Sequence, residues 1–288
     1  MFDSLTIQNI MIGASCLLTL GCSQPGGFLA RADGAIGEPI NELLDGSTMT
    51  STTSDGAVVI EVMPNEMMSF FVTSRGVEVN GQTVTGGNFG GIAGADAFCR
   101  QLALEVLPNN ARTWRAYLST TTENARDRIG TGPWLNFDGT IIADSVEDLH
   151  QAPPPFGQMI TEDGSAGFFP PALGHGILTG STPDGRAFQS LSELMPYFIF
   201  PDGSYEYPNK IFDFTCNNWS TDGTANGDSN RASNYAIMGH VDWDTILENR
   251  PGLDQRAYQW NAAHLTACDA SIMRSDTSNI RLYCFAID

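Results

Sequence analysis

The most regular hydrophobic pattern in the chain runs from Gly94 to Leu107. Apolar residues recur there every three or four positions, which is the spacing of one face of an α-helix. Asp96 falls in the expected first turn, where a negative charge suits the positive end of the helix dipole. Pro108 ends the segment because it cannot continue a helix. The pattern therefore predicts a helix whose buried face is formed by Ala95, Phe98, Cys99, Leu102 and Val106.

The other apolar runs are shorter and predict strands. Residues 69–74, bounded by turn-forming residues, are the first of them, and residues 280–287 are the last. Between them, residues 113–119 alternate apolar and polar positions, as a strand with one buried face does. The first and last segments lie at opposite ends of the folded part, so their pairing would close the domain into a loop.

Turn-forming residues organise the middle of the chain. Residues 134–143 predict a hairpin, because Asp138-Gly139 is a favoured turn pair between two apolar runs. Residues 124–129 predict a short second helix, and residues 151–215 are expected to be mostly loop because they are rich in proline and other turn formers. With helices early, short strands late and a loop-rich middle, the pattern favours an α+β fold.

The first 22 residues have the features of an export signal. Ile10 to Gly21 form an apolar run of signal-peptide length, too short for a comfortable membrane span. A small residue followed by cysteine, here Gly21-Cys22, is typical of bacterial lipoprotein signals, in which Cys22 would carry the lipid. Residues 1–9 hold Asp3 and no Lys or Arg, and Thr19 stands where Leu is preferred. An ordinary secreted protein and an unprocessed anchor are therefore the alternatives.

The signal is followed by a segment of different composition. Residues 23–67 are rich in Gly, Ser, Thr and Asp up to about position 55, with few large apolar residues to offset the entropy of ordering them. We predict a flexible tether here, with a short strand at 57–62 near its end. Residues 68–288 then form the folded domain. The expected location is the cell envelope, with a secreted protein as the alternative.

The charge balance limits the partners of this chain. It has 14 Lys and Arg against 33 Asp and Glu, a formal net charge of −19. A surface this acidic repels nucleic acid, heparin-like polyanions and anionic lipid headgroups. We therefore expect no nucleic-acid partner, no heparin binding, and membrane contact only through a lipid anchor. The same charge suits solubility outside the cell or the binding of divalent cations.

Four of the six cysteines lie in the expected domain: Cys99, Cys216, Cys268 and Cys284. They are widely spaced and form no CxxC pair, which argues against a structural zinc site. In an exported chain an even number of such cysteines predicts two disulfides. Four cysteines allow three pairings, and spacing alone does not choose among them.

Several short segments occur here in the same order as in one known family. They include Gly94-Ala-Asp-Ala-Phe-Cys99, Thr113-Trp-Arg-Ala-Tyr-Leu-Ser119, Ala125-Arg-Asp-Arg-Ile-Gly130, Leu135 to Ala143, His175-Gly176, Pro183-Asp-Gly-Arg186, Cys216-Asn-Asn-Trp219 and Leu282-Tyr-Cys284. Together they resemble the endostatin domain of collagens and, more closely, bacterial endostatin-like outer-membrane lipoproteins, a group that includes the leptospiral endostatin-like proteins. The resemblance covers about residues 68–288.

The resemblance implies a fold, a disulfide pairing and a role. The fold is a C-type-lectin-like domain with long loops, and the nested pairing is Cys99–Cys284 and Cys216–Cys268. Its outer bond would tie the first helix to the last strand. The role is that of a surface protein that binds extracellular matrix proteins and complement regulators. Residues 187–215 form a longer stretch than the family has at this place, so the resemblance gives no local structure there.

The loop around residues 220–230 is dense in oxygen-bearing side chains, among them Asp222, Asn226 and Asp228. A Ca²⁺ ion requires six to eight oxygen ligands, which such a loop could supply. The spacing is not that of an EF-hand, because Ser233 stands where that motif has Glu. Endostatin-like domains generally lack a calcium site, so we expect a solvated, turn-rich loop, with Ca²⁺ as the alternative and no other cofactor.

A second candidate metal site is the sequence around His240. On a strand, His240, Asp242 and Asp244 would share one face and could bind a metal. A hydrogen-bonded histidine near the core is the simpler expectation. No nucleophile, phosphate-binding or metalloprotease motif occurs in the chain. We therefore predict that the protein is not an enzyme, with an envelope metalloenzyme using His240 and Asp242 as the alternative.

The best candidate binding surface is the apolar segment 196–207 inside the long insertion. An exposed apolar patch of this kind is typical of docking sites. Its aromatic side chains are Tyr197, Phe198, Phe200, Tyr205 and Tyr207. The predicted function is thus a non-catalytic, adhesin-like binding module for an extracellular protein or glycan. A structural envelope protein is the other alternative, suggested by the tether.

Overall fold

The computed structural model describes residues 48–52, 58–62, 65–84, 86–166, 176–188, 213–222, 235–249, 259–268 and 280–288. The chain forms two compact units, Met1–Met63 and Pro64–Asp288. In the first unit β1 (Thr48–Thr52) pairs antiparallel with β2 (Val58–Val62). The strand predicted at 57–62 is therefore present, and its partner lies within the segment predicted as a tether.

The second unit is built around a three-stranded sheet in the order β3–β12–β6. The strands are β3 (Phe70–Val72), β6 (Trp114–Ala116) and β12 (Tyr283–Ala286), and β12 pairs antiparallel with both neighbours. The first and last predicted strands of the domain are thus hydrogen-bonded to each other, which confirms that their pairing closes it.

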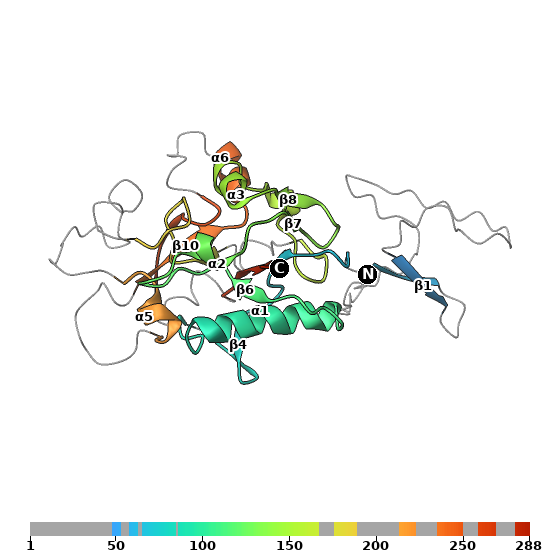
Figure 1. Cartoon of the computed structure of the whole chain (residues 1–288), viewed down its shortest axis with the longest axis horizontal. Helices are drawn as coiled ribbons and strands as arrows, with labels where there is room; N and C mark the ends of the chain where they lie inside the picture. The colour runs from blue at the N-terminus through green and yellow to red at the C-terminus, as the bar shows by residue number, and fades with distance from the viewer. Residues whose placement is uncertain are drawn as a thin grey trace, which may run out of the picture. The chain divides into compact units, whose positions relative to one another are not determined.

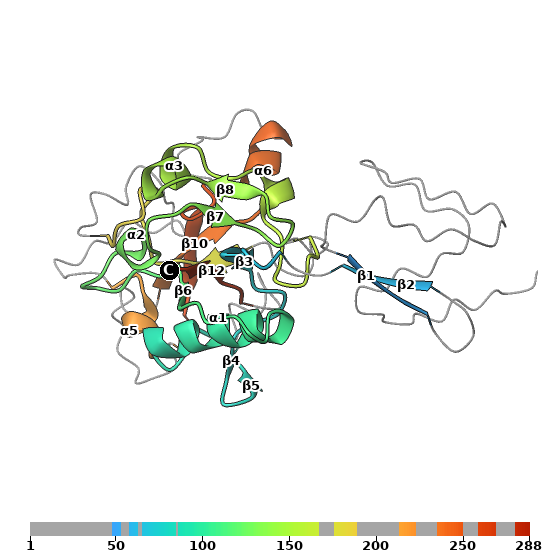
Figure 2. The same ribbon diagram turned by 45° about the vertical axis from the view of Figure 1, so that its right-hand side comes forward.

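Both faces of this sheet are buried. Along β12, Cys284 and Ala286 pack into one apolar cluster, while Tyr283 and Phe285 pack into another, as alternation in a strand requires. Phe71 contributes to the first cluster. In Figures 1 and 2, α1 (Ile92–Val106) lies on one side of these strands, and α3 (Val146–Gln151) and α6 (Trp243–Asn249) lie on the other. The sheet is therefore the middle layer of the domain.

The predicted first helix is present as α1, with Ala95, Phe98, Cys99 and Leu102 buried and Val106 only partly buried against the core. It begins two residues before the predicted start. Asp96 consequently lies beyond the first turn, and the prediction that it serves the helix dipole is wrong.

Asp96 instead takes part in a buried ion pair. Arg128, whose side chain is 2 % exposed, donates from Nη2 to both carboxylate oxygens of Asp96, at 2.7 and 2.8 Å. Its Nη1 donates to Glu123 at 2.7 Å, and Asp96 also accepts from the backbone N–H of Ala116 at 2.9 Å. Arg128 ends α2 (Ala125–Arg128), so this pair joins α1, α2 and β6.

Short elements complete this half of the domain. The predicted hairpin is β7 (Trp134–Leu135) with β8 (Ile141–Ala143), and its register is irregular between Trp134 and Leu135. A second hairpin, β4 (Glu78–Val79) with β5 (Gln82–Thr83), precedes α1. The 3₁₀ turn η1 (Phe156–Gln158) follows α3.

A second sheet, in the order β11–β10–β9, contains β9 (Gly176–Leu178), β10 (Tyr235–His240) and β11 (His264–Ala267). The sequence pattern did not predict these strands. Because strands and helices alternate along the described chain, the expected order of helices early and strands late is wrong. The coarser prediction holds: the domain mixes helices with small sheets and contains two disulfides, as an α+β fold does.

Candidate functional site

Both disulfides join the cysteines that the family resemblance pairs. Cys99 in α1 is bonded to Cys284 in β12, with Cα atoms 5.5 Å apart. Cys216 is bonded to Cys268, with Cα atoms 5.6 Å apart. All four cysteines are fully buried. The outer bond fastens the central sheet to its covering helix, and the inner bond lies in an irregular part of the fold.

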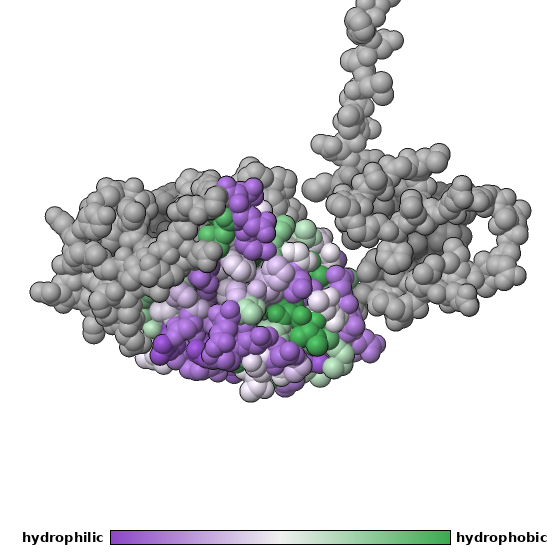
Figure 3. Space-filling model, turned by 90° about the horizontal axis from the view of Figure 1, so that it is seen from above, coloured by the Kyte–Doolittle hydropathy of each residue, from purple (hydrophilic) through white to green (hydrophobic). Residues whose placement is uncertain are grey.

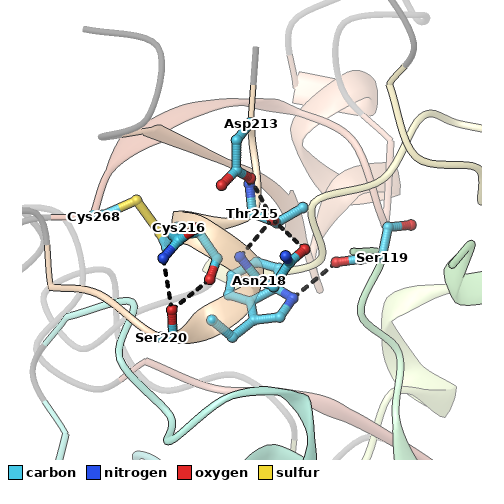
Figure 4. The surroundings of a disulfide bond; sticks show 9 residues. Ser119, Asp213, Thr215, Cys216, Asn218, Ser220 and Cys268 are labelled. Atoms are coloured by element: carbon cyan, nitrogen blue, oxygen red, sulfur yellow. Dashed lines mark hydrogen bonds between the residues drawn. A yellow bond between two sulfur atoms is a disulfide. The ribbon is translucent and has the colours of Figure 1, made fainter. Parts of the chain in front are cut away.

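The inner disulfide begins a turn with unusual backbone geometry (Figure 4). The short element α5 (Cys216–Trp219) has positive φ at every residue, from 51° at Cys216 to 65° at Trp219. L-residues adopt this left-handed conformation at a cost of about 1–2 kcal/mol each. Such a run persists only where surrounding contacts over-determine it.

Polar side chains hold the turn from both ends. The hydroxyl of Thr215 accepts a hydrogen bond from the backbone N–H of Asn218 at 3.0 Å. The side-chain oxygen of Asn218 accepts from the N–H and the hydroxyl of Thr121, at 2.8 and 3.1 Å. Asn217 donates to the hydroxyl of Ser220 at 3.0 Å. The amide side chains of the two asparagines therefore stabilise the left-handed backbone that they belong to.

Trp219 connects the turn to the start of α1. Its indole N–H donates to the carbonyl of Ser119 at 2.8 Å, a bond that Figure 4 shows. Its ring stacks on that of Phe89, with centroids 5.5 Å apart and planes 10° apart. Its carbonyl accepts from the N–H groups of Phe89 and Gly91, each at 2.9 Å. The glycine-rich segment before α1 is thus anchored on this turn.

Gly87 packs directly against the inner disulfide. A Cβ atom at this position would lie 2.3 Å from Sγ of Cys216, which is far inside van der Waals contact. The N–H of Gly87 donates to the carbonyl of Cys268 at 3.1 Å. The absence of a side chain here allows the segment to cover the bond closely.

A chain of polar groups lies across the aromatic core. The ring Nδ1 of His150 lies 2.6 Å from the carbonyl of Val146, so Nδ1 carries the hydrogen and Nε2 accepts. Nε2 lies 2.8 Å from the hydroxyl of Tyr117, which therefore donates to it. Burial lowers the pKa of His150 below its ordinary value and raises that of Tyr117. Both groups are neutral at neutral pH in this arrangement.

Asn261 extends this chain to an outer loop. Its buried Nδ2 lies 2.8 Å from the hydroxyl oxygen of Tyr117 and 3.1 Å from each of the carbonyl oxygens of Thr182 and Pro183, so its two hydrogens are shared among three acceptors. Its Oδ1 has no hydrogen-bond partner in the described part of the chain. The three polar side chains therefore connect α3, the strand end after β6 and the loop at 182–187.

A buried carboxylate lies at the other edge of the central sheet. Glu162 accepts hydrogen bonds from the backbone N–H of Ser74, at 2.9 Å, and from its hydroxyl. Burial raises the pKa of Glu162, against the effect of these bonds. Arg281 donates to the carbonyl of Ser74 at 3.2 Å, and burial lowers its pKa to about 10. These contacts join the ends of β3 and β12 and have a structural role.

One pocket, of about 260 Å³, lies beside the ends of the central sheet. Apolar walls from Met67, Pro133, Trp134 and Ile287 dominate it, with Arg112 as its cationic group. Met67 is 56 % exposed. On the coloured part of the face drawn in Figure 3, hydrophilic residues predominate and the apolar ones gather in small patches. The pocket is large enough for a side chain or a single sugar ring, below the usual size of drug-like sites.

The candidate metal site at His240 is not formed as expected. His240 is the last residue of β10 and is buried, Asp242 lies in the turn that follows, and Asp244 lies in α6. Three side chains share a strand face only while the backbone stays extended, and it does not. The carboxylate of Asp244 accepts from the N–H of Phe156 at 3.0 Å instead. In the ranges that the structure describes, no three His, Cys, Asp or Glu side chains gather as a metal site.

Most other predicted site residues lie outside the described residues. This applies to the lipidation candidate Cys22, to Asn226 and Asp228 of the calcium candidate, and to all five aromatic residues of the segment 196–207. Asp222 is described and is partly buried. These predictions remain untested by the structure.

No protein-family model matches the chain, and no curated protein matches it. Among the helices that the structure describes, none is long and apolar enough to cross a membrane.

Three features of this region were missed from the sequence. The left-handed turn had one signal, the pair Asn217-Asn218, since Asn is the non-glycine residue that tolerates positive φ best. The hydrogen-bonded series His150, Tyr117 and Asn261 had no sequence signal, because 111 positions separate His150 from Asn261. The pocket combines residues from both ends of the domain, so no local pattern could indicate it.

Proposed function

We propose that the protein is an exported binding protein, anchored by a lipid on Cys22, that is not an enzyme. Its domain, residues 68–288, has the C-type-lectin-like fold of the endostatin-like group. It binds an extracellular protein or a glycan at the cell surface, as an outer-membrane lipoprotein facing outside. The observation that carries this proposal is the nested pair of buried disulfides, Cys99–Cys284 and Cys216–Cys268.

The segments that carry the resemblance support the fold assignment because they contact one another. Asp96 from the first motif pairs with Arg128 from the motif at 125–130. The Cys216–Trp219 motif anchors the glycine-rich approach to α1. Segments that contact one another in the folded domain are expected to occur together in a sequence, because each helps to position the other.

The hydrogen bonds made by the polar side chains that the structure describes favour a binding protein over an enzyme. The His150 ring, the Tyr117 hydroxyl and the Glu162 carboxylate all bond to other groups of the fold. A catalytic group needs a reactive atom directed at a substrate. The two candidate contact surfaces are the segment 196–207 and the pocket around Met67.

A binding assay with matched variants tests the proposal. The mature chain would be applied to arrays of matrix proteins, complement regulators and glycans, and the dissociation constant measured for each ligand found. Replacing Tyr197, Phe198 and Phe200 with Ser would weaken binding at least about tenfold if the aromatic segment is the contact. Met67→Gln would do so if the pocket is the contact. Ile141→Gln serves as the control, because Ile141 is the other exposed large apolar residue in the part of the chain that the structure describes.

The outcomes of this assay are distinct. A ligand whose affinity falls in one variant set supports the proposal and locates the site. A ligand unaffected by all variants places the site elsewhere on the same module. The absence of any ligand on all three arrays would overturn the binding role.

The lipid anchor has its own test. Metabolic labelling with a fatty acid should mark the wild-type chain and leave Cys22→Ala unlabelled, and the variant should leave the membrane fraction. Cys16→Ala is the matched control, because it changes the other cysteine of the apolar run. Equal labelling of wild type and Cys22→Ala would contradict the anchor.

A further inference from the structure

The loop from Thr182 to Ala187 is held between two helices. On the side of α2, Arg126 donates from its side chain to the carbonyl of Asp184 at 2.8 Å and from its backbone to that of Gly185 at 3.1 Å. On the side of α3, a Cβ atom on Gly185 would lie 2.3 Å from Nε2 of His150. The loop backbone is therefore packed directly against the imidazole ring.

We infer that His150, Tyr117 and Asn261 form a proton-controlled latch that holds the loop at 182–187 against the domain at neutral pH and releases it in acid. The latch exists in its closed form in the structure. The neutral ring accepts from Tyr117, which leaves the oxygen of Tyr117 free to accept from Asn261. Asn261 can then direct Nδ2 at the two loop carbonyls.

Adding one proton reverses the direction of these bonds. The proton goes to Nε2 of His150, because Nδ1 already carries a hydrogen that faces Val146. Nε2–H then points at the oxygen of Tyr117, so the Tyr117 hydrogen has to turn to another acceptor. Oδ1 of Asn261, which is buried and has no partner among the described residues, is an acceptor in the side chain that already bonds to this hydroxyl.

Using that acceptor releases the loop. Oδ1 faces Tyr117 only if the carboxamide of Asn261 turns over, and this takes Nδ2 away from the carbonyls of Thr182 and Pro183. These carbonyls are only partly buried, and once they lose their donor they are satisfied by water, so the loop opens. In the closed state Nδ2 of Asn261 bonds to the loop carbonyls, and in the open state Oδ1 accepts from Tyr117. One orientation of the carboxamide cannot make both sets of bonds, so the latch has two distinct states.

The surrounding charges act on this equilibrium. Arg126 on α2 disfavours the imidazolium, while Asp184 in the loop and Glu147 on α3 favour it. Burial is the largest effect and lowers the pKa of His150, so release is expected below the ordinary histidine range. When the loop leaves, the ring becomes more hydrated, which favours the charged form and makes opening cooperative.

Hydrogen exchange of the mature chain tests the latch. The amides of Gly185, Arg186 and Ala187 all bond within or beside the loop. After correction for intrinsic rates, their protection should fall at least about tenfold between about pH 7.5 and about pH 5. Amides of β12 should show no such change and serve as the internal reference.

Two variants separate the latch from general acid loosening. His150→Gln removes the titrating group, and its loop protection should not depend on pH over this range. Tyr117→Phe keeps the histidine but removes the hydroxyl that passes the change to Asn261, so its loop should stay protected at both pH values. His175→Gln, the same substitution at another histidine, should respond like wild type.

Constant protection in the wild type would overturn the latch. So would a wild-type response in either His150→Gln or Tyr117→Phe. If His150→Gln does not fold, Tyr117→Phe decides the question alone.

Discussion

Cys99–Cys284 and Cys216–Cys268 fasten regions of opposite character. The outer bond joins a regular right-handed helix to the central strand of a sheet, and hydrogen bonds of α1 and β12 would define both elements without it. The inner bond starts a run of four left-handed residues whose partners come from loops. A covalent link adds stability to the first region, whereas in the second it also maintains the local conformation.

The largest expected effect is the loss of the outer disulfide. It closes a separation of 185 residues, and the chain-entropy model gives a contribution of about 5 kcal/mol for a loop of that size. Replacing Cys99 and Cys284 with Ala should lower the free energy of unfolding in urea by about that amount. The backbone of α1 should remain helical in the variant, because its pairing with the sheet does not depend on sulfur.

The inner disulfide should contribute less overall and more locally. Its separation is 52 residues, for which the same model gives about 4 kcal/mol. In the variant with Ala at Cys216 and Cys268, the amides of Phe89 and Gly91 should lose exchange protection first, because the left-handed turn that holds them relaxes. Equal loss across the whole domain in both disulfide variants would remove the contrast between the two regions.

Variants of the ion pair between Asp96 and Arg128 test how much non-covalent contacts contribute to the stability of the outer region. Asp96→Asn leaves the buried Arg128 short of a negative partner and should cost about 3 kcal/mol. Glu123→Gln is the matched control, because Glu123 pairs with the same guanidinium but is 44 % exposed. It should cost below about 1 kcal/mol. Urea unfolding of both variants gives the comparison, and similar losses would contradict it.

The same contrast explains what the sequence could and could not predict. The helix α1 follows from the spacing of Ala95, Phe98 and Leu102 and from Pro108, which are local signals. The closing strands follow from apolar runs near the two ends. The α+β class needed no more than these elements.

The inner region depends on contacts that no local pattern contains. Spacing left three disulfide pairings open, and the pairing came from the resemblance. The strand Tyr235–His240 has an unbroken apolar stretch in its middle, which does not distinguish a strand from a buried helix. Positive φ at Cys216 and Trp219 has no sequence signal, because neither residue type favours it.

Filling the space over the inner disulfide tests its packing. Gly87→Ala places a Cβ atom against Sγ of Cys216, and overpacking of this kind should cost about 2 kcal/mol. Gly157→Ala is the control, since nothing lies within 4 Å of a Cβ atom there. Thermal or urea unfolding should separate the two variants, and an unchanged stability of Gly87→Ala would mean that the segment does not cover the bond.

The smallest expected effect concerns Asn217, whose exposed side chain bonds only to Ser220 among the described residues. At its φ of 55°, Asn217→Ala should cost about 1 kcal/mol, because alanine tolerates the left-handed region poorly. Asn217→Gly should cost less, because glycine adopts positive φ freely. Asn249→Ala in the right-handed helix α6 should be close to neutral. Both substitutions remove the bond to Ser220. A larger loss of stability for Gly than for Ala at position 217 would therefore show that neither this bond nor the left-handed backbone limits the stability of the turn. The conformation of the inner region would then depend on the disulfide alone.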